Sequence, residues 1–280
     1  MVDNPFPLTA EPRICKLYET FMSIKLTFLG TGTSVGVPQI GCNCPVCTST
    51  DPRDKRNRSG VYVRTGKAAF LIDMPPEFRV ACLEYGVTKV DALVFTHAHM
   101  DHIASFDDIR RFNTINQGSP MRCYAAEETI ESVKRIFPYI SDKKNELGLY
   151  RPMINYCPVS EPFAIGDAKL TPLPVEHGPR TNGYRIDCGN SSLAYVPDCA
   201  SIPQTTLDLM AGLDVLILDC LREREHPTHL NIEKTLSYME KLAPERGFVT
   251  HICHDISHAG FERKLPPHIR PAYDGLEITT

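Results

Sequence analysis

Apolar and polar positions alternate along the chain in short segments, and in its first half these segments predict more strands than helices. Residues 24–29 alternate as a half-buried strand does, and residues 60–72 hold two apolar runs around a short turn, which is typical of a hairpin. Apolar residues recur at helical spacing from Ile103 to Phe112. The first half therefore predicts strands at 24–29, 60–64, 68–72, 90–96 and 121–125, and helices at 78–85, 103–113 and 128–137.

The second half of the chain also mixes strand and helix patterns. It predicts strands at 163–175, 182–188, 192–196, 214–221 and 247–250, and helices at 203–211 and 231–243. Gly189-Asn190 is a favourable turn between two of these strands. Residues 141–160 have no clear period, so two readings stay open: a loop or lid over a site, or a surface excursion.

The order of these elements predicts an α/β fold. Strands dominate each half and helices punctuate them, a pattern that two sheets with helices outside them would bury. We therefore expect a four-layered αββα sandwich rather than a doubly wound parallel sheet. Residues 1–23 are proline-rich and weakly patterned and form an N-terminal extension, while residues 24–280 form a single domain.

Composition narrows the classes of protein. A net charge of -4 provides no global basic field, so composition does not support wholesale nucleic-acid binding. No apolar run is long enough to span a bilayer, and the first residues lack the apolar core of a secretory signal, so we expect a cytoplasmic protein. The odd number of cysteines, 11, and their placement in apolar stretches favour reduced thiols over a disulfide framework.

The densest chemical signal is a run of three histidines and one aspartate directly after the apolar segment 92–95. Side chains at i and i+2 of an extended segment share a face, so His97 and His99 can bind one metal ion. Asp101 and His102 begin the next element and point back toward a second ion. This density of ligand side chains predicts a two-metal site.

Other ligand-type residues stand at the ends of predicted strands: His177, Asp198 and His251 each follow one. Strand ends converge at one edge of a sandwich, so these distant positions can meet the histidine run. Asp73 also follows an apolar strand; it either orients a ligand histidine or has a structural role in a helix cap or turn.

A separate cluster of thiols lies in residues 41–47. Cys42, Cys44 and Cys47 have the spacing to bind one tetrahedral zinc ion, and His254 can supply the fourth ligand. Such a closed site is structural. The runner-up interpretation is a redox-active thiol cluster, and a disulfide pair is the third.

With these residues in view, the chain resembles the metallo-β-lactamase fold superfamily across most of residues 24–280. The resemblance implies a ligand set for each ion and a shared carboxylate. The first ion would be bound by His97, His99 and His177, the second by Asp101, His102 and His251, and Asp198 would bridge them. The sequence does not choose between Mn2+ and Zn2+ for this active site, whereas the cysteine cluster calls for Zn2+.

Several segments are similar to a narrower group, the PhnP-like phosphodiesterase branch, which is related to tRNase Z. They are residues 30–34, the three cysteines, residues 51–53 and residues 56–59. In tRNase Z a late histidine assists phosphodiester cleavage, and the resemblance implies this role for His229, with His226 as the alternative. A surface histidine at a helix start is the competing structural interpretation.

We therefore predict a hydrolase that cleaves small cyclic or nucleotide-type phosphodiesters through a metal-bridging hydroxide, with Asp101 and His229 as catalytic residues. A lactone- or thioester-directed hydrolase is the main rival. Asp198 argues against a β-lactamase, which the resemblance implies would lack it, although Cys199 beside it weakens that argument. A tRNA 3'-processing nuclease ranks lower, since no long basic arm is evident.

The expected partner is a small phosphodiester or nucleotide. We expect no membrane and no stable nucleic-acid partner, and a homodimer rests on analogy alone.

Overall fold

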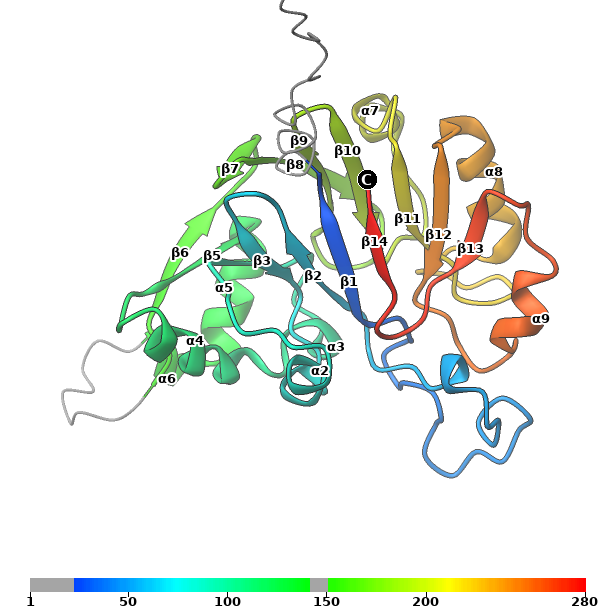
Figure 1. The fold of residues 1–280 in the computed structure, drawn as a ribbon, viewed down its shortest axis with the longest axis horizontal. Helices are drawn as coiled ribbons and strands as arrows, with labels where there is room; N and C mark the ends of the chain where they lie inside the picture. Colours follow the sequence, from blue (N-terminus) through cyan, green and yellow to red (C-terminus); the bar gives the residue numbers. More distant parts are fainter. Residues whose placement is uncertain (1–22, 142–150) are drawn as a thin grey trace, which may run out of the picture.

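The computed structural model describes residues 23–141 and 151–280, and its strands form two seven-stranded sheets (Figure 1). The strands of the first sheet are β1 Lys25–Gly30, β2 Gly60–Arg64, β3 Ala69–Ile72, β4 Ala92–Val94, β5 Met121–Ala125, β6 Ile154–Pro158 and β14 Glu277–Thr279. Those of the second are β7 Phe163–Ile165, β8 Ala168–Val175, β9 Thr181–Cys188, β10 Ser191–Val196, β11 Val215–Asp219, β12 Arg246–Thr250 and β13 Ile269–Pro271. The strand orders are β14-β1-β2-β3-β4-β5-β6 and β13-β12-β11-β10-β9-β8-β7.

Helices cover the outer face of each sheet (Figure 1). Those beside the first sheet are α2 Phe78–Glu84, α3 Met100–Ile103, α4 Arg110–Ile115, α5 Glu127–Ile136 and α6 Pro138–Ser141. Those beside the second are α7 Gln204–Leu209, α8 Ile232–Leu242 and α9 His258–Glu262, and short 3-10 helices span Pro52–Asp54 and Phe106–Ile109. Within the described residues, no helix has the length and apolar character needed to cross a bilayer.

Three apolar cores separate four layers. The first lies between the sheets, where Phe28 of β1 packs against Phe248 of β12 with ring centroids 6.4 Å apart. The second lies between the first sheet and its helices, and the third lies between the second sheet and α7 to α9. Central strands are therefore buried on both faces: Ile217 of β11 faces the inter-sheet core, and Leu218 faces the helices. The predicted αββα sandwich is confirmed.

Strand directions decide where the functional residues meet. In the second sheet, β8 and β10 each run antiparallel to β9, and β10, β11 and β12 are mutually parallel. In the first sheet, β3 and β4 are parallel. The carboxyl ends of β8, β10, β11 and β12 therefore lie at one edge of their sheet, and those of β3 and β4 lie together in the other.

The structure corrects three predicted elements. Residues 141–160 contain a strand, β6, which pairs in parallel with β5 at the edge of the sheet. The predicted strand 163–175 is two strands, because Gly166 adopts a φ of 61° and turns the chain between β7 and β8. The predicted helix 103–113 is a succession of α3, a 3-10 helix and α4, although its apolar positions are buried as expected.

Further elements were not predicted: the 3-10 helix Pro52–Asp54, α6, α9, β13 and β14. Some predictions fall on residues outside the described ranges. These are the N-terminal extension apart from Ser23, and residues 142–150 of the predicted loop or lid.

Candidate metal centre and active site

The predicted ligand residues come together at one edge of the sandwich. His97 lies just beyond β4, His177 just beyond β8, Asp198 just beyond β10 and His251 directly after β12. All four are buried. The convergence expected from strand ends is therefore present, and both sheets contribute to it.

The first group consists of His97, His99, His177 and Asp198. His99 Nδ1 lies 2.9 Å from His97 Nε2 and 3.2 Å from His177 Nε2. Asp198 Oδ2 lies 3.7 Å from His97 Nε2 and 3.5 Å from His177 Nε2. Nitrogen ligands about 2.05 Å from a tetrahedral ion are about 3.3 Å apart, so these four atoms have the spacing of a metal site.

The second group consists of Asp101, His102, Asp198 and His251. His102 Nε2 lies 3.4 Å from Asp101 Oδ2 and 3.3 Å from Asp198 Oδ2. His251 Nε2 lies 3.4 Å from Asp198 Oδ1 and 3.8 Å from Asp101 Oδ2. Asp198 thus belongs to both groups, and its position fits the expected bridging role.

The donor atoms themselves fit a metal. His102 Nε2, His251 Nε2 and Asp198 Oδ1 are buried and have no hydrogen-bond partner among the described residues. Buried polar atoms are costly unless a hydrogen bond or an ion satisfies them. Imidazole nitrogens and carboxylate oxygens suit Zn2+ or Mn2+, so cation binding accounts for these atoms.

Asp73 is placed to orient a ligand-type histidine, one of its two predicted roles. Its Oδ2 accepts a hydrogen bond from His102 Nδ1 at 2.7 Å and from Thr96 Oγ1 at 2.8 Å, and Oδ1 accepts from the Thr96 backbone at 2.9 Å. Thr96 Oγ1 in turn lies 3.0 Å from His97 Nδ1. One buried carboxylate therefore fixes the His102 ring directly and the His97 ring through Thr96, with both Nε2 atoms facing the centre.

Two site residues have left-handed backbone conformations. The φ angles are 68° at Asp73 and 58° at His251. Side chains other than glycine rarely adopt this region, and such conformations cluster at functional sites. At both positions the chain turns sharply after a strand and brings a polar side chain to the centre.

Electrostatics divide the histidines into two sets. Burial lowers the pKa of His97 and of His177, which keeps these rings in the neutral form that binds metals. Burial opposes protonation of His102 and His251 as well, but nearby carboxylates prevail and raise the pKa of His251 to about 9 and that of His102 well above its usual value. Metal binding must displace these protons, so affinity rises with pH.

His229 lies beside the two ligand groups, and with Asp219 and His251 it forms a further cluster of ligand-type atoms. Its ring stacks on His251 with centroids 4.6 Å apart and an interplanar angle of 16°, and it lies 4.8 Å from the His177 ring. His229 Nδ1 donates to Asp219 Oδ2 at 2.9 Å. Because Nδ1 is engaged by this carboxylate, Nε2 is the ring atom left for a substrate.

Asp219, which ends β11, was missed in the sequence analysis. Its Oδ2 also accepts from the backbone N–H groups of Cys199 at 3.0 Å and Leu230 at 3.3 Å. The available signal was an aspartate that closes a strongly apolar strand, the same pattern that singled out Asp73. Cys199 contributes its backbone here and belongs to neither ligand group among the described residues.

The alternative residue, His226, differs from His229 in its hydrogen-bond partners. Its Nδ1 lies 3.2 Å from Thr228 Oγ1, and it has no carboxylate partner among the described residues. The rings of His226 and His229 are 5.1 Å apart, but only for His229 are ring contacts with His177 and His251 observed among the described residues. The geometry favours His229 over His226 as the residue that contacts substrate.

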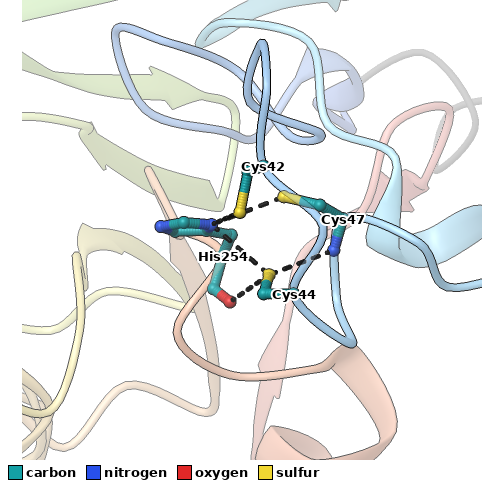
Figure 2. A group of neighbouring side chains, drawn as sticks. All are labelled: Cys42, Cys44, Cys47 and His254. Atoms are coloured by element: carbon teal, nitrogen blue, oxygen red, sulfur yellow. Dashed lines mark hydrogen bonds between the residues drawn. The ribbon is translucent and has the colours of Figure 1, made fainter.

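The cysteine loop forms a second candidate site (Figure 2). His254 Nδ1 lies 3.3 Å from Cys42 Sγ, 3.5 Å from Cys44 Sγ and 3.4 Å from Cys47 Sγ. A tetrahedral zinc with Zn–S of about 2.3 Å would separate such atoms by about 3.6 Å, so the four residues fit this ion. The backbone N–H of Cys47 lowers the pKa of Cys44 to about 6, which favours a thiolate.

This cysteine cluster is connected to the histidine centre through a short segment of chain. His254 follows His251 by three residues, and the Ile252 N–H between them donates to the Thr31 carbonyl at 2.9 Å. Asp255 forms an ion pair at 3.1 Å with Arg224, which belongs to the same loop as His229. His254 therefore joins the cysteine cluster to the segment that carries His251.

Solved structures similar to this chain include a diphosphatase described as a new member of the PhnP family. It is 40% identical, with a TM-score of 0.85, and the match covers 92% of this chain and 98% of that one. The short form of human tRNase Z is 16% identical, with a TM-score of 0.64, over 91% of this chain and 98% of that one. The latter likeness concerns the fold alone.

A curated relative is an octanoyltransferase from Porphyromonas gingivalis, 33% identical over 264 residues. The match covers 91% of this chain but 51% of the relative, so the chain spans about half the length of that protein.

The family model for a β-lactamase superfamily domain matches residues 69–252, which include all the residues of the two histidine groups. This match, the diphosphatase structure and the site geometry agree. The chain belongs to the β-lactamase superfamily, with the metallo-β-lactamase fold, and within it to the PhnP family.

Proposed function

We propose that this chain is a dinuclear metal-dependent phosphodiesterase acting on small cyclic or nucleotide-type substrates, including diesters of diphosphate. The observation that carries the proposal is the Asp219–His229 pair beside two ligand groups that share Asp198. A phosphodiester needs neutralisation of its oxygens and a proton for the leaving oxygen, and this arrangement offers both. The diphosphatase relative supports chemistry at phosphorus.

The residues divide this work between them. Two divalent ions, Zn2+ or Mn2+, would supply positive charge for the phosphate and lower the pKa of water. His97, His99, His177, Asp101, His102, His251 and Asp198 would hold them. Asp219 holds the His229 ring so that Nε2 can donate a proton to the departing oxygen, and its negative charge stabilises the protonated imidazole.

Carbonyl-directed chemistry is the second candidate, because the octanoyltransferase relative is named for acyl transfer. A comparison of substrates tests the proposal directly. We expect the zinc- or manganese-loaded protein to hydrolyse bis-p-nitrophenyl phosphate and a dinucleotide linked through diphosphate far faster than an octanoyl thioester or a lactone. Faster cleavage of the thioester or lactone would overturn the assignment, and selective trimming of precursor tRNA would point to the processing nuclease.

The role of His229 predicts a specific defect. His229→Ala should lower kcat on bis-p-nitrophenyl phosphate by about 10²- to 10⁴-fold, because general acid catalysis contributes this much. Elemental analysis should find unchanged metal content. His226→Ala is the matched control on the same loop and should retain most of the activity; the reverse pattern would transfer the role to His226.

The substitution Asp219→Asn removes the negative charge of this residue but keeps its hydrogen-bond acceptor. The amide oxygen can still accept from Cys199, Leu230 and His229, but the negative charge is gone. We expect kcat to fall at least about tenfold, as when a carboxylate that supports a catalytic imidazole is neutralised. Asp214→Asn, before the start of the same strand, is the control; an unchanged kcat for Asp219→Asn would exclude the charge role.

We also propose that the cysteine cluster binds a structural zinc ion. Cys44→Ser should lose the zinc of this cluster while the histidine centre keeps its metal, and the apparent melting temperature should fall because a structural ion stabilises the fold. Zinc analysis and thermal unfolding measure both effects. Cys157→Ser on β6 is the control. Equal zinc content in the two variants would contradict the assignment.

A further inference from the structure

The two sheets end in the neighbouring edge strands β13 and β14 (Figure 1). A cavity lies here, lined by residues of β12, β13 and β14. Its volume is about 590 Å3. We call it the edge groove, and the residues used below are Arg246, Phe248, Arg270, Leu276 and Ile278. None of them belongs to the histidine centre or the cysteine cluster.

The floor of the edge groove is apolar. Phe248 and Ile278 are part of the inter-sheet core, and Leu276 packs against that core. β13 pairs only with β12, and β14 pairs only with β1, so no further strand covers the core here among the described residues. The groove is the open side of the sandwich.

Two arginines project over this floor. Arg270 is the register partner of Phe248, and Arg246 precedes Phe248 by two residues on the same strand. Side chains at these positions share one face of a sheet, so both arginines point toward the other sheet, as Phe248 does. Arg246 confirms this direction, because its Nη2 donates to the Thr279 carbonyl of β14 at 2.6 Å.

The positive charge of the groove is not neutralised internally. Glu262 and Glu277 also line the groove, but each already pairs with other cations: Glu277 with Lys25 at 2.5 Å and Arg64 at 2.7 Å, and Glu262 with Arg53 at 3.5 Å. Arg270 is exposed and forms no ion pair within the described part of the chain. Arg246 binds a neutral carbonyl. Both guanidinium groups therefore retain their charge for an external anion.

We propose that the edge groove binds a small amphipathic organic anion. The acidic head, a carboxylate or a phosphate monoester, lies between Arg246 and Arg270, whose planar guanidinium groups match such oxyanions. The apolar part lies against Phe248, Leu276 and Ile278. This inference is independent of the proposed catalytic function.

A calorimetric titration of the metal-loaded protein with octanesulfonate tests the site, because a sulfonate is a poor ligand for the ions of the histidine centre. We expect saturable binding that weakens as salt is added. Butanesulfonate should bind at least about tenfold more weakly, because it buries fewer methylene groups against the apolar floor. Binding that ignores chain length would overturn the amphipathic assignment.

Variants then locate the site. The double variant Arg246→Gln and Arg270→Gln should weaken octanesulfonate binding at least about tenfold, the effect of losing roughly 1.4 kcal/mol of charge-assisted contact. Arg263→Gln, just beyond α9 and outside the groove, should bind as the native protein does. Equal affinity in the double variant, or absence of saturable binding by the native protein, would overturn the proposal.

Competition binding and self-association are two further measurements that decide what the two arginines do. Competition by octanoate and by octyl phosphate distinguishes a carboxylate from a phosphate as the natural head group. Inward-facing charges also protect open sheet edges from pairing with other chains. If the double variant self-associates while the native protein shows no anion binding, edge protection is their role and the ligand site is excluded.

Discussion

The histidine centre depends on one constraint: Asp198 must stand where both ligand groups can use its carboxylate. Its Oδ2 is 3.3 Å from His102 Nε2, and its Oδ1 is 3.4 Å from His251 Nε2. A buried carboxylate among imidazoles is tolerable only when positive charge surrounds it, and the pKa of Asp198 is accordingly held well below its usual value despite full burial. The parallel ends of β8, β10, β11 and β12 satisfy this constraint, because they bring distant segments to one edge.

Around Asp198, supporting residues fix the direction of three rings. Asp73 engages His102, the Thr228 carbonyl lies 2.8 Å from His177 Nδ1, and Asp219 engages His229. Each partner occupies Nδ1, so each ring presents Nε2 inward. A hydrogen bond at Nδ1 therefore orients His102 and His177, which belong to the ligand groups, and also His229, the residue assigned to the leaving group. His229 differs from the other two only in its place beside the ligand groups.

The sequence was most informative where the signal was local. The spacing of the residues from His97 to His102 is enough to predict that their side chains lie together. The same holds for the three cysteines of the cysteine loop. Strands of three residues, such as β13 and β14, carry no period to detect, and β14 pairs with β1 from the opposite end of the chain. Asp219 was missed for a related reason, because its partner His229 becomes a neighbour only when the loop after β11 folds back.

Each ligand group takes residues from both sheets. His97, His99, Asp101 and His102 follow β4 of the first sheet, whereas His177, Asp198 and His251 follow strands of the second. Neither half of the chain therefore holds a complete coordination set. During synthesis the histidine run after β4 is made before Asp198 and His251, so neither ligand group can form until the strands of the second sheet have been made and have docked on the first.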